Sequence, residues 1–426
     1  MLTRILHNSP ALCTFVEQLD LSLSKPQQQH VTNLVDALLV CDGPKTLAAL
    51  QREFVRGACV DVSNMADTLR IAPWTASDLQ EPVGTFLVRA AIAQTRAIGK
   101  LNYISISLDD SLARKHKHTK CLEGVDWHYN HLESTPKQPR FANGLAYLAC
   151  HLCIGGVAVT FAVRPYLREK TVRRLNRHRT HENHLLFRSK FRVAQEILQA
   201  LVPLLPTDIP IYVLHDEWYA SARLMRWTHR HRWETITALK RNRKLDHCRL
   251  DQHTTTARHQ RYEPVTVTAT DGTPSTYFTR TFTGRLEDLA FDVRVIDSKR
   301  HPRAPRSAYF GCTALQLKTQ PALQIYGQRW GCETDNVYLH TRLGVGDFRV
   351  RPYEAIVKWL AVVHLSLGYL QWRLMREQTR ALPNLAAIIR FHRDEHARDW
   401  LTGACQEAMT TGDLTAVLNR YLAQDG

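Results

Sequence analysis

The sequence lacks a disulfide framework, and its apolar stretches are all interrupted. Its ten cysteines are scattered over 426 residues, without the close spacing of a secreted, disulfide-stapled domain, so we expect a reducing cytoplasm. The most apolar stretch, residues 355–370, contains Lys358 and His364 and therefore predicts a buried helix instead of a membrane span. No secretory leader is expected at the start of the chain. Cys150 and Cys153 form a lone CxxC in an apolar run, which favours a structural strand over a zinc site.

Acidic residues are in short supply. The chain has 40 Asp and Glu against 56 Lys and Arg, which gives a formal net charge of +16, and it has 21 histidines besides. Such an excess favours a polyanionic partner, above all nucleic acid, although an ordinary basic enzyme would also fit. Residues 164–192 carry ten Lys and Arg against two Glu. This run includes Arg173, Arg174 and Arg177, and it is expected to contact phosphates unless it is only a solvated face.

Internal repeats and low-complexity tracts do not stand out, and the apolar periodicity divides the chain instead. Helical spacing dominates both ends, while the middle alternates strands and helices around a segment of β-branched alternation. The resulting units are residues 1–100 (helical), 101–245 (strands and helices), 246–318 (strands), 319–350 (helix) and 351–426 (helical). Within the last unit, residues 382–393 and 405–422 predict two separate helices.

Acidic side chains follow two apolar strands. A strand at 101–108 leads into Asp109 and Asp110, and a strand at 209–215 leads into Asp216. The carboxyl ends of strands in an α/β sheet are where ligands usually bind. An Asp-rich turn at the end of a strand is nevertheless common by itself, so neither place alone establishes a site.

A hairpin and a basic cluster complete the strand pattern. The apolar runs 145–154 and 157–163 are joined by two glycines, which predicts a β-hairpin. The strand at 233–239 is followed by cations grouped around an asparagine and suited to phosphate oxygens, namely Lys240, Arg241, Asn242 and Arg243.

The stretch from position 326 to 344 predicts one helix with unusual chemistry. At helical spacing, one face carries Tyr326, Arg329, Trp330 and Glu333, and His340 continues it. A carboxylate beside an arginine and two aromatic rings is not typical of a solvated face. Both a half-buried helix with an internal Arg–Glu pair and a functional site fit this pattern.

This last stretch resembles a block of the DDE transposases of bacterial insertion sequences. Their block reads Y-x2-R-x3-E-x6-K, which Tyr326, Arg329 and Glu333 match. His340 stands in place of the final lysine, with Arg342 two residues on. At that position we expect a weaker, pH-sensitive contact with phosphate.

Two upstream blocks carry the same resemblance. An apolar strand followed by Asp109, Asp110 and Ser111 is similar to the family's first block, and Asp216 with Tyr219 three residues on is similar to its second. The family's first block reads Asp-Gly as well as Asp-Asp. The resemblance therefore implies that Asp109 is the metal ligand and that Asp110 is a turn residue bonding nearby backbone.

The resemblance implies a fold, an activity and a set of site residues. The fold would be a ribonuclease-H-like mixed-sheet core with an all-β insertion, a helical N-terminal domain that binds the transposon end, and a helical C-terminal region. Two Mg2+ or Mn2+ ions, held by Asp109, Asp216 and Glu333, would support cleavage at transposon ends and strand transfer into target DNA by cut and paste. The enzyme would act as a homodimer on DNA in the bacterial cytoplasm, at the nucleoid. DNA contacts would come from Tyr326, Arg329, Trp330, His340, Arg342, Lys240, Arg241, Asn242, Arg243, Arg173, Arg174 and Arg177.

Three alternatives stay open on the sequence. A domesticated relative would bind DNA without cutting it, and the histidine at position 340 keeps that hypothesis open. A metal-dependent endonuclease would cleave without needing specific ends and without joining strands. A glycosidase that uses two of the acids fits poorly, because it would leave the basic surface unexplained.

Overall fold

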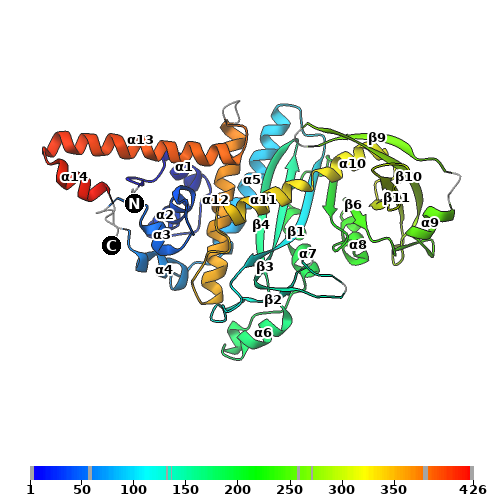
Figure 1. Ribbon diagram of the computed structural model, residues 1–426, viewed down its shortest axis with the longest axis horizontal. Coiled ribbons are helices and arrows are strands. Elements are labelled where there is room, and N and C mark those ends of the chain that lie inside the picture. The colour runs from blue at the N-terminus through cyan, green and yellow to red at the C-terminus, as the bar shows by residue number, and fades with distance from the viewer. Residues whose placement is uncertain are drawn as a thin grey trace.

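The computed structural model describes residues 4–55, 60–130, 133–135, 137–256, 260–269, 272–377 and 382–422. Along its longest axis, the molecule has a helical bundle at one end, a sheet in the middle and the strands of the insertion at the other end (Figure 1). The bundle combines the first helices of the chain with the last ones, which meet there from opposite ends of the sequence.

A ten-stranded sheet organises the middle of the molecule and the insertion. Its order is β2-β3-β1-β5-β6-β12-β11-β10-β9, with β4 paired to β3 outside this path. The strands are β1 (Ile104–Arg114), β2 (Asp126–Tyr129), β3 (Phe141–Ile154), β4 (Val157–Tyr166), β5 (Ile211–His215), β6 (Glu234–Leu239), β9 (Glu263–Thr268), β10 (Pro274–Arg285), β11 (Asp292–Lys299) and β12 (Ala308–Cys312). Strands β1, β5 and β6 run parallel and the other pairings are antiparallel. This mixed sheet, with helices before it and after it in the sequence, confirms the predicted fold class.

The hairpin expected between two apolar runs is present as β3 and β4. The two strands pair closely up to a tight turn at Gly155 and Gly156, with Ile154 opposite Val157. Both glycines have positive φ, +55° and +89°, which residues with a Cβ rarely adopt.

Strand β1 is longer than the sequence predicts. We expected it to end before Asp109, but it continues through Asp109 and Asp110 to Arg114. It is held by antiparallel pairing with β3 over its whole length, from Ile104 opposite Ile154 to Arg114 opposite Gly144. Pairing with a long neighbour therefore overrides the turn-like local composition, and Asp110 is a strand residue instead of the expected turn residue.

The insertion extends the core sheet. Strand β12 pairs antiparallel with β6, which places Cys312 opposite Ile236, and β11, β10 and β9 follow in turn. A short helix, α9 (Leu250–Thr256), also lies in this segment. Helix α10 (Thr319–Gly327) packs against β6 and β9, so the chain returns from the insertion to the core along this helix.

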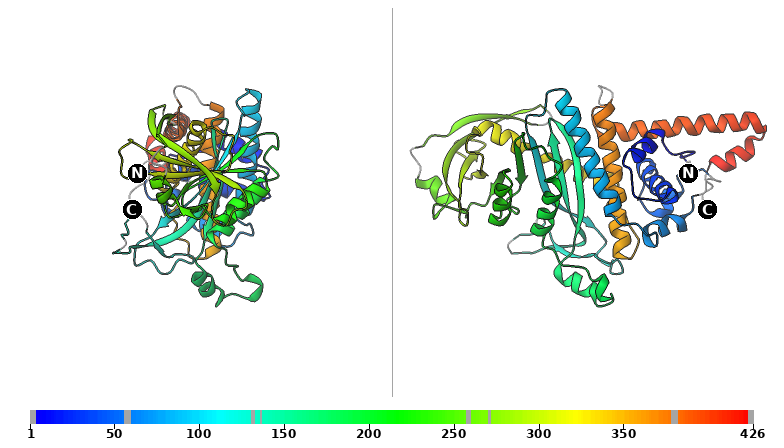
Figure 2. Two further views of the ribbon diagram at one scale, coloured as in Figure 1. Left: turned by 90° about the vertical axis from the view of Figure 1, so that its right-hand side faces the viewer. Right: turned by 180° about the vertical axis from the view of Figure 1, so that it is seen from behind.

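Helix α12 (Tyr353–Glu377) lies at the centre of the molecule, and it contains the buried helix predicted at 355–370. It is buried because it lies between the sheet and the bundle, packing against β4 and α5 on one side and α2, α4 and α13 on the other (Figure 2). Among the described residues, no helix combines the length and apolar character that crossing a bilayer requires. The helices around it are α1 (Pro10–Gln18), α2 (Lys25–Val40), α3 (Leu47–Gln51), α4 (Val62–Arg70), α5 (Ser77–Ala97) and α13 (Leu385–Thr411).

The C-terminal helices differ from the prediction of two helices at 382–393 and 405–422. Helix α13 runs without a break from Leu385 to Thr411, and only then does α14 (Leu414–Tyr421) follow. The break comes at Gly412, whose φ of +67° is the left-handed conformation that ends helices. The residues between the two predicted segments therefore join them into one helix.

Candidate active site

The pairing of two parallel strands brings the first two predicted acids together. Strands β1 and β5 run parallel with Ser107 opposite Leu214, and Asp109 and Asp216 each stand two residues further along. Both carboxylates therefore lie at the same edge of the sheet, beyond the carboxyl end of β5. This is the place where ligands bind in sheets of this kind.

Glu333 comes to the same place from the first turn of α11 (Trp330–Thr341), which packs across β1 and β3. Arg329, at the start of that helix, joins two of the acids. Its Nη1 lies 3.3 Å from Asp109 Oδ2 and its Nη2 lies 3.1 Å from Glu333 Oε1. The guanidinium thus occupies the position of a cation between two carboxylates.

In the described part of the chain, the three carboxylates of the site have one arginine, Arg329, to balance their negative charge. Burial, and next the nearby carboxylates of Glu333 and Asp216, raise the pKa of Asp109 to about 7 against the opposing effect of Arg329. A carboxylate with this pKa is only about half ionised at neutral pH. Added cationic charge would restore its ionised form, which is what a metal-binding carboxylate requires.

The three carboxylates fit hard divalent cations. Carboxylate oxygens are the preferred protein ligands of Mg2+ and Mn2+. Among the described residues, Asp109, Asp216 and Glu333 do not form a cluster in which one carboxylate oxygen from each lies within 4.8 Å of the other two.

Asp216 is oriented by the backbone that follows it. Its Oδ1 accepts hydrogen bonds from the amides of Trp218 (2.9 Å) and Tyr219 (3.2 Å), which leaves its second oxygen outside this turn. Its neighbour Glu217 is exposed.

Asp110 points to the opposite face of the sheet, as expected for the next residue on a strand. Its Oδ2 accepts from Lys190 Nζ at 2.6 Å, and its Oδ1 accepts from the Tyr219 hydroxyl at 3.0 Å. Lys190 begins α7 (Lys190–Leu201), which packs against β3 and β4. Asp110 therefore links a strand, a helix and a buried tyrosine, and it has a structural role that the sequence did not predict.

The predicted helix at 326–344 is broken at its start. Helix α10 ends at Gly327 and α11 begins at Trp330, with tight turns between them in which the amide of Gly331 donates to Gln328 O. The close approach of Gly331 to β3 goes with this break, since a Cβ on Gly331 would lie 2.3 Å from His151 Nε2. As a result Trp330 turns outward and is 63 % exposed.

The other predicted residues of this stretch have different surroundings. Tyr326 packs edge-on against Phe310, with ring centroids 4.9 Å apart, and Arg342 is exposed just after α11. His340 Nε2 lies 2.9 Å from Ser111 Oγ and within hydrogen-bond distance of a buried tyrosine hydroxyl. Burial, and next the charge of Arg114, lower the pKa of His340, so it is mainly neutral at neutral pH.

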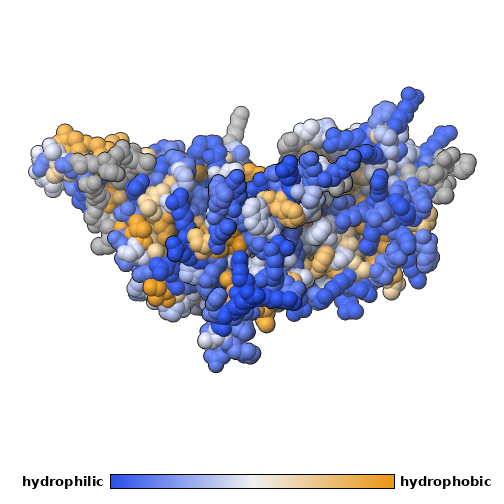
Figure 3. All heavy atoms as spheres, turned by 60° about the horizontal axis from the view of Figure 1, so that its bottom comes forward, coloured by the Kyte–Doolittle hydropathy of each residue, from blue (hydrophilic) through white to orange (hydrophobic). Residues whose placement is uncertain are grey.

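The basic clusters predicted from the sequence lie in two places. The group Lys240, Arg241, Asn242 and Arg243 follows β6, and Lys240 Nζ lies 5.5 Å from the ring centre of Trp218, next to the loop of the second acid. Arg173, Arg174 and Arg177 belong to α6 (Glu169–Asn176) or to its carboxyl end, below the sheet in Figure 1. The face around α6 is covered mainly by hydrophilic side chains (Figure 3).

A groove of about 880 Å³ is lined by Asp110 and Trp218, which are close to Asp109 and Asp216 in the sequence, and it passes Arg168 before α6. Its walls combine cations and aromatic rings, among them Arg168, Lys190, Tyr129, Phe141, Tyr166, Trp218 and His340. Tyr129, Phe141 and Trp218 are 44 %, 54 % and 45 % exposed, which is unusual for large apolar side chains. Cations beside exposed rings are the surface that binds single-stranded or unpaired nucleotides.

Sequence analysis missed the buried network that fixes α11. Asp335 Oδ2 accepts from His151 Nδ1 at 2.5 Å and from Thr160 Oγ1 at 2.6 Å, and its Oδ1 accepts from Gln371 Nε2 at 3.3 Å. These residues come from α11, β3, β4 and α12. A polar residue inside each of these apolar stretches was the available signal, but nothing in the sequence paired them.

The lone CxxC cannot form a chelate. Cys150 and Cys153 are three residues apart on β3, so their side chains lie on opposite faces of the strand. This geometry agrees with the structural role that the sequence favoured.

Comparisons with known proteins agree with the geometry. The sequence profile of a family described as DDE superfamily endonuclease matches residues 15–281, which is more than half of the chain. The match includes Asp109 and Asp216 and ends before Glu333, so the place of the third acid rests on the structure. No curated protein matches the chain.

Proposed function

Because the chain belongs to the DDE superfamily endonucleases, we propose that it is a DNA transposase of the bacterial insertion-sequence type. It cleaves DNA at transposon ends and joins them to target DNA by cut and paste. The observation that carries the proposal is the position of Asp109 and Asp216 at the same edge of the sheet, with Arg329 joining Asp109 to Glu333. An endonuclease that does not join strands is the alternative against which the proposal is tested.

Each residue of the site has a role in this proposal. Asp109, Asp216 and Glu333 would hold two divalent ions, with Asp109 as the ligand common to both and Asp216 and Glu333 each serving one. When bound, Mg2+ or Mn2+ activates the attacking hydroxyl and neutralises charge on the phosphate. Arg329, released from Asp109 and Glu333 by that added charge, becomes available for a phosphate oxygen as a planar fork.

The DNA path follows the groove beside the site. Its cations, Arg168 and Lys190, suit the phosphate backbone, and its exposed rings suit bases at an opened end. The basic helix α6 and the cluster at 240–243 extend this surface on two sides. The helices of residues 1–100 bind the transposon end in this proposal.

The proposed homodimer has a candidate contact on the last two helices. Leu401, Met409, Leu414 and Leu418 are 57 %, 86 %, 61 % and 46 % exposed on α13 and α14. A group of exposed apolar side chains on adjacent helices is typical of a protein interaction surface. Such a dimer on DNA would act at the nucleoid of a bacterial cytoplasm.

The test uses the full chain with a supercoiled plasmid that carries the short inverted repeats expected to flank its coding DNA. With Mg2+ or Mn2+ we expect nicks at the repeat ends followed by strand transfer, and none with EDTA. Cleavage in EDTA would reject the metal mechanism. Cleavage at random sites without joining would reject transposition in favour of a nuclease.

The raised pKa of Asp109 predicts a pH-dependent metal affinity. A folded-state pKa near 7 means that binding must displace a proton below pH 7 and none well above it. The apparent affinity for Mn2+ should therefore fall about tenfold for each pH unit below about 7, and be nearly constant above about 8. Calorimetric titration with Mn2+ measures it, with Asp110→Asn as the control that keeps the profile. A flat profile down to about pH 5 would contradict the assignment of Asp109.

The basic helix α6 predicts a change in salt dependence. Neutralising Arg173, Arg174 and Arg177 together should flatten the slope of log affinity against log salt by about 2–3 units. The matched control replaces three exposed arginines of α12 and α13, namely Arg376, Arg390 and Arg398. If both triple variants change the slope equally in a binding titration with a repeat-end duplex, α6 has no specific role in contacting DNA.

A further inference from the structure

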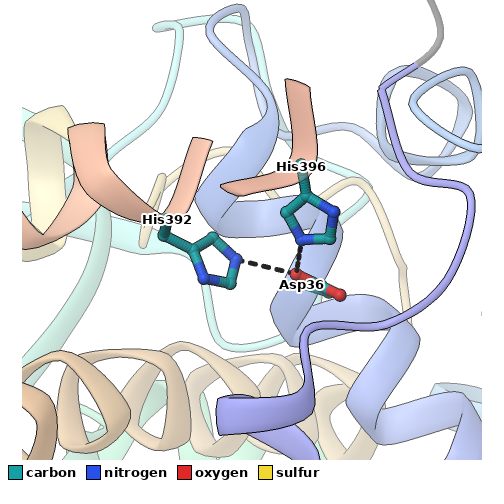
Figure 4. A group of neighbouring side chains, drawn as sticks. All are labelled: Asp36, His392 and His396. Carbon is teal, nitrogen blue, oxygen red and sulfur yellow. Dashed lines mark hydrogen bonds and ion pairs between the residues drawn. The ribbon is translucent and has the colours of Figure 1, made fainter. Parts of the chain in front are cut away.

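The helical bundle contains a buried polar cluster that the proposed DNA chemistry does not use. Asp36 lies in α2, and His392 and His396 stand four residues apart on one face of α13. Figure 4 shows both imidazole rings directed at the same carboxylate. The side chains of Asp36, His392 and His396 are 0 %, 0 % and 3 % exposed.

The contacts of the carboxylate are few and well defined. Both imidazole Nε2 atoms donate to Asp36 Oδ1, at 2.8 Å each. The other oxygen, Oδ2, accepts the backbone amide of Ser9 at 3.0 Å. On its far side, His392 Nδ1 lies 3.2 Å from the hydroxyl of Tyr369 on α12. A hydrogen bond to the second ring nitrogen is the arrangement that orients histidines bound to metals.

The buried carboxylate of Asp36 is held in its charged form. Burial would raise the pKa of Asp36, but the hydrogen bonds from His392 and His396 outweigh it and hold that pKa well below its usual range. The carboxylate is therefore charged inside the protein, where an unbalanced charge is costly. A cation bound beside Asp36 would balance that charge.

The positions of the ligand atoms suit a small ion. One atom from each of the three residues lies within 4.8 Å of the other two. Around tetrahedral zinc, with bonds of about 2.0–2.2 Å, ligand atoms lie ~3.3 Å apart. The present nitrogen–oxygen separation of 2.8 Å would have to widen by only about 0.5 Å, which small rotations of the side chains allow.

We propose that Asp36, His392 and His396 bind a divalent transition-metal ion, with zinc as the expected occupant. Two imidazoles and one carboxylate suit zinc, whereas Mg2+ and Ca2+ prefer oxygen ligands alone. A water or the second carboxylate oxygen fills the fourth position. The site is structural, and it is separate from the acids at the sheet edge.

The ion would act as a clamp between distant parts of the chain. Asp36 is 356 residues from His392 and 360 residues from His396. The clamp holds α13 against the N-terminal bundle and so fixes the direction in which α13 and α14 project from it (Figure 1). Because the ion binds only the folded arrangement, it stabilises that arrangement by mass action.

The test begins with the zinc content of the full chain, purified without chelator and dialysed. We expect about one zinc ion per chain in the wild type, and a loss of about tenfold or more in the double variant His392→Gln/His396→Gln. Glutamine Nε2 can still donate to Asp36, so this variant keeps the hydrogen bonds and removes the ligands. The control is His181→Gln/His184→Gln, an exposed histidine pair with ring centroids 5.3 Å apart, which should keep its zinc.

Two further measurements use the same proteins. Removal of metal should lower the Tm of the wild type, and zinc should restore it, with no response in the His392→Gln/His396→Gln variant. Cobalt added to metal-free wild type should give the visible absorption of a tetrahedral site, which does not depend on whether any variant folds.

A hydrogen-bonded cluster without metal is the competing outcome. Wild-type zinc no higher than in the His392→Gln/His396→Gln variant, or no cobalt absorption in metal-free wild type, would overturn the proposal. Neither measurement involves DNA, so this failure would leave the proposed transposase activity untouched, and failure of DNA cleavage would leave the clamp untouched.

Discussion

Asp109→Asn is expected to slow nicking of supercoiled donor plasmid by roughly 10³-fold or more, while binding of the repeat ends stays close to that of the wild type. Metal ions contribute several kcal/mol of transition-state stabilisation, and ~4 kcal/mol corresponds to about three powers of ten in rate. Asp109 shares the guanidinium of Arg329 with Glu333 and lies on β1, which pairs with the strand before Asp216. Its replacement therefore affects the ligands of both ions. End binding persists because lysines and arginines supply most of the affinity for DNA.

Asp110→Asn is the matched control for this prediction. Asparagine can still accept from the Tyr219 hydroxyl, but it loses the charge that pairs with Lys190. We expect lower stability with nicking retained within about tenfold. The opposite order of defects, with Asp110→Asn inactive and Asp109→Asn active, would move the site one residue along the chain.

A stability measurement separates chemistry from folding in Asp109→Asn. The folded-state pKa of Asp109 is about 7, whereas the ordinary pKa of an aspartate is 3.8. The folded state therefore binds more protons than the unfolded state between these values, and its stability falls as the pH rises from about 4 to about 7. In metal-free protein near pH 8, Asp109→Asn should raise the Tm relative to the wild type. An inactive variant that is also less stable there would indicate misfolding as the cause of the lost activity.

The local pattern predicted several of the strands and the two aspartates that lie together at the sheet edge, because each block could be interpreted by itself. Apolar runs predicted β3, β4 and β5, and the acids after β5 and within β1 meet because parallel neighbours share an edge. The prediction that Asp110 is a turn residue was wrong, because it depends on a distant partner strand. Whether a strand continues past an acid depends on the length of its partner, and the eleven residues of β1 are set by pairing with β3.

Features that depend on close approach or on distant pairing could not be predicted. The break between α10 and α11 goes with the lack of a Cβ on Gly331 where it meets His151, 180 residues away. The insertion joins the sheet through pairing of β12 with β6, which no local pattern encodes. The same holds for the cluster of Asp36 with His392 and His396, because each residue is an ordinary polar position in its own helix.

The second large effect is expected at Asp335, two residues beyond Glu333 on α11. Its carboxylate is 5 % exposed and accepts hydrogen bonds from His151, Thr160 and Gln371. Asp335→Ala leaves the buried donors of His151 and Thr160 without this acceptor, while Gln371 keeps its hydrogen bond to Thr160. Removing one partner from such a network costs about 3–5 kcal/mol. Denaturant unfolding of the full chain should show this loss. The control Asp399→Ala removes the exposed partner of His7, 3.6 Å away, and should change the free energy of unfolding by less than about 1 kcal/mol.

The effect of Asp335 on cleavage distinguishes a positioning role from a purely structural one. Its hydrogen bonds hold α11 against β3 and β4. In this way they fix the position of the Glu333 carboxylate relative to that of Asp109. Asp335→Asn keeps part of the network and should fold, yet with a looser helix it should need more Mg2+ for half-maximal nicking than the wild type. If the only role of Asp335 is stability, Asp335→Asn assayed well below its Tm should show the wild-type Mg2+ dependence. That outcome would reject the link between the buried network and the third acid.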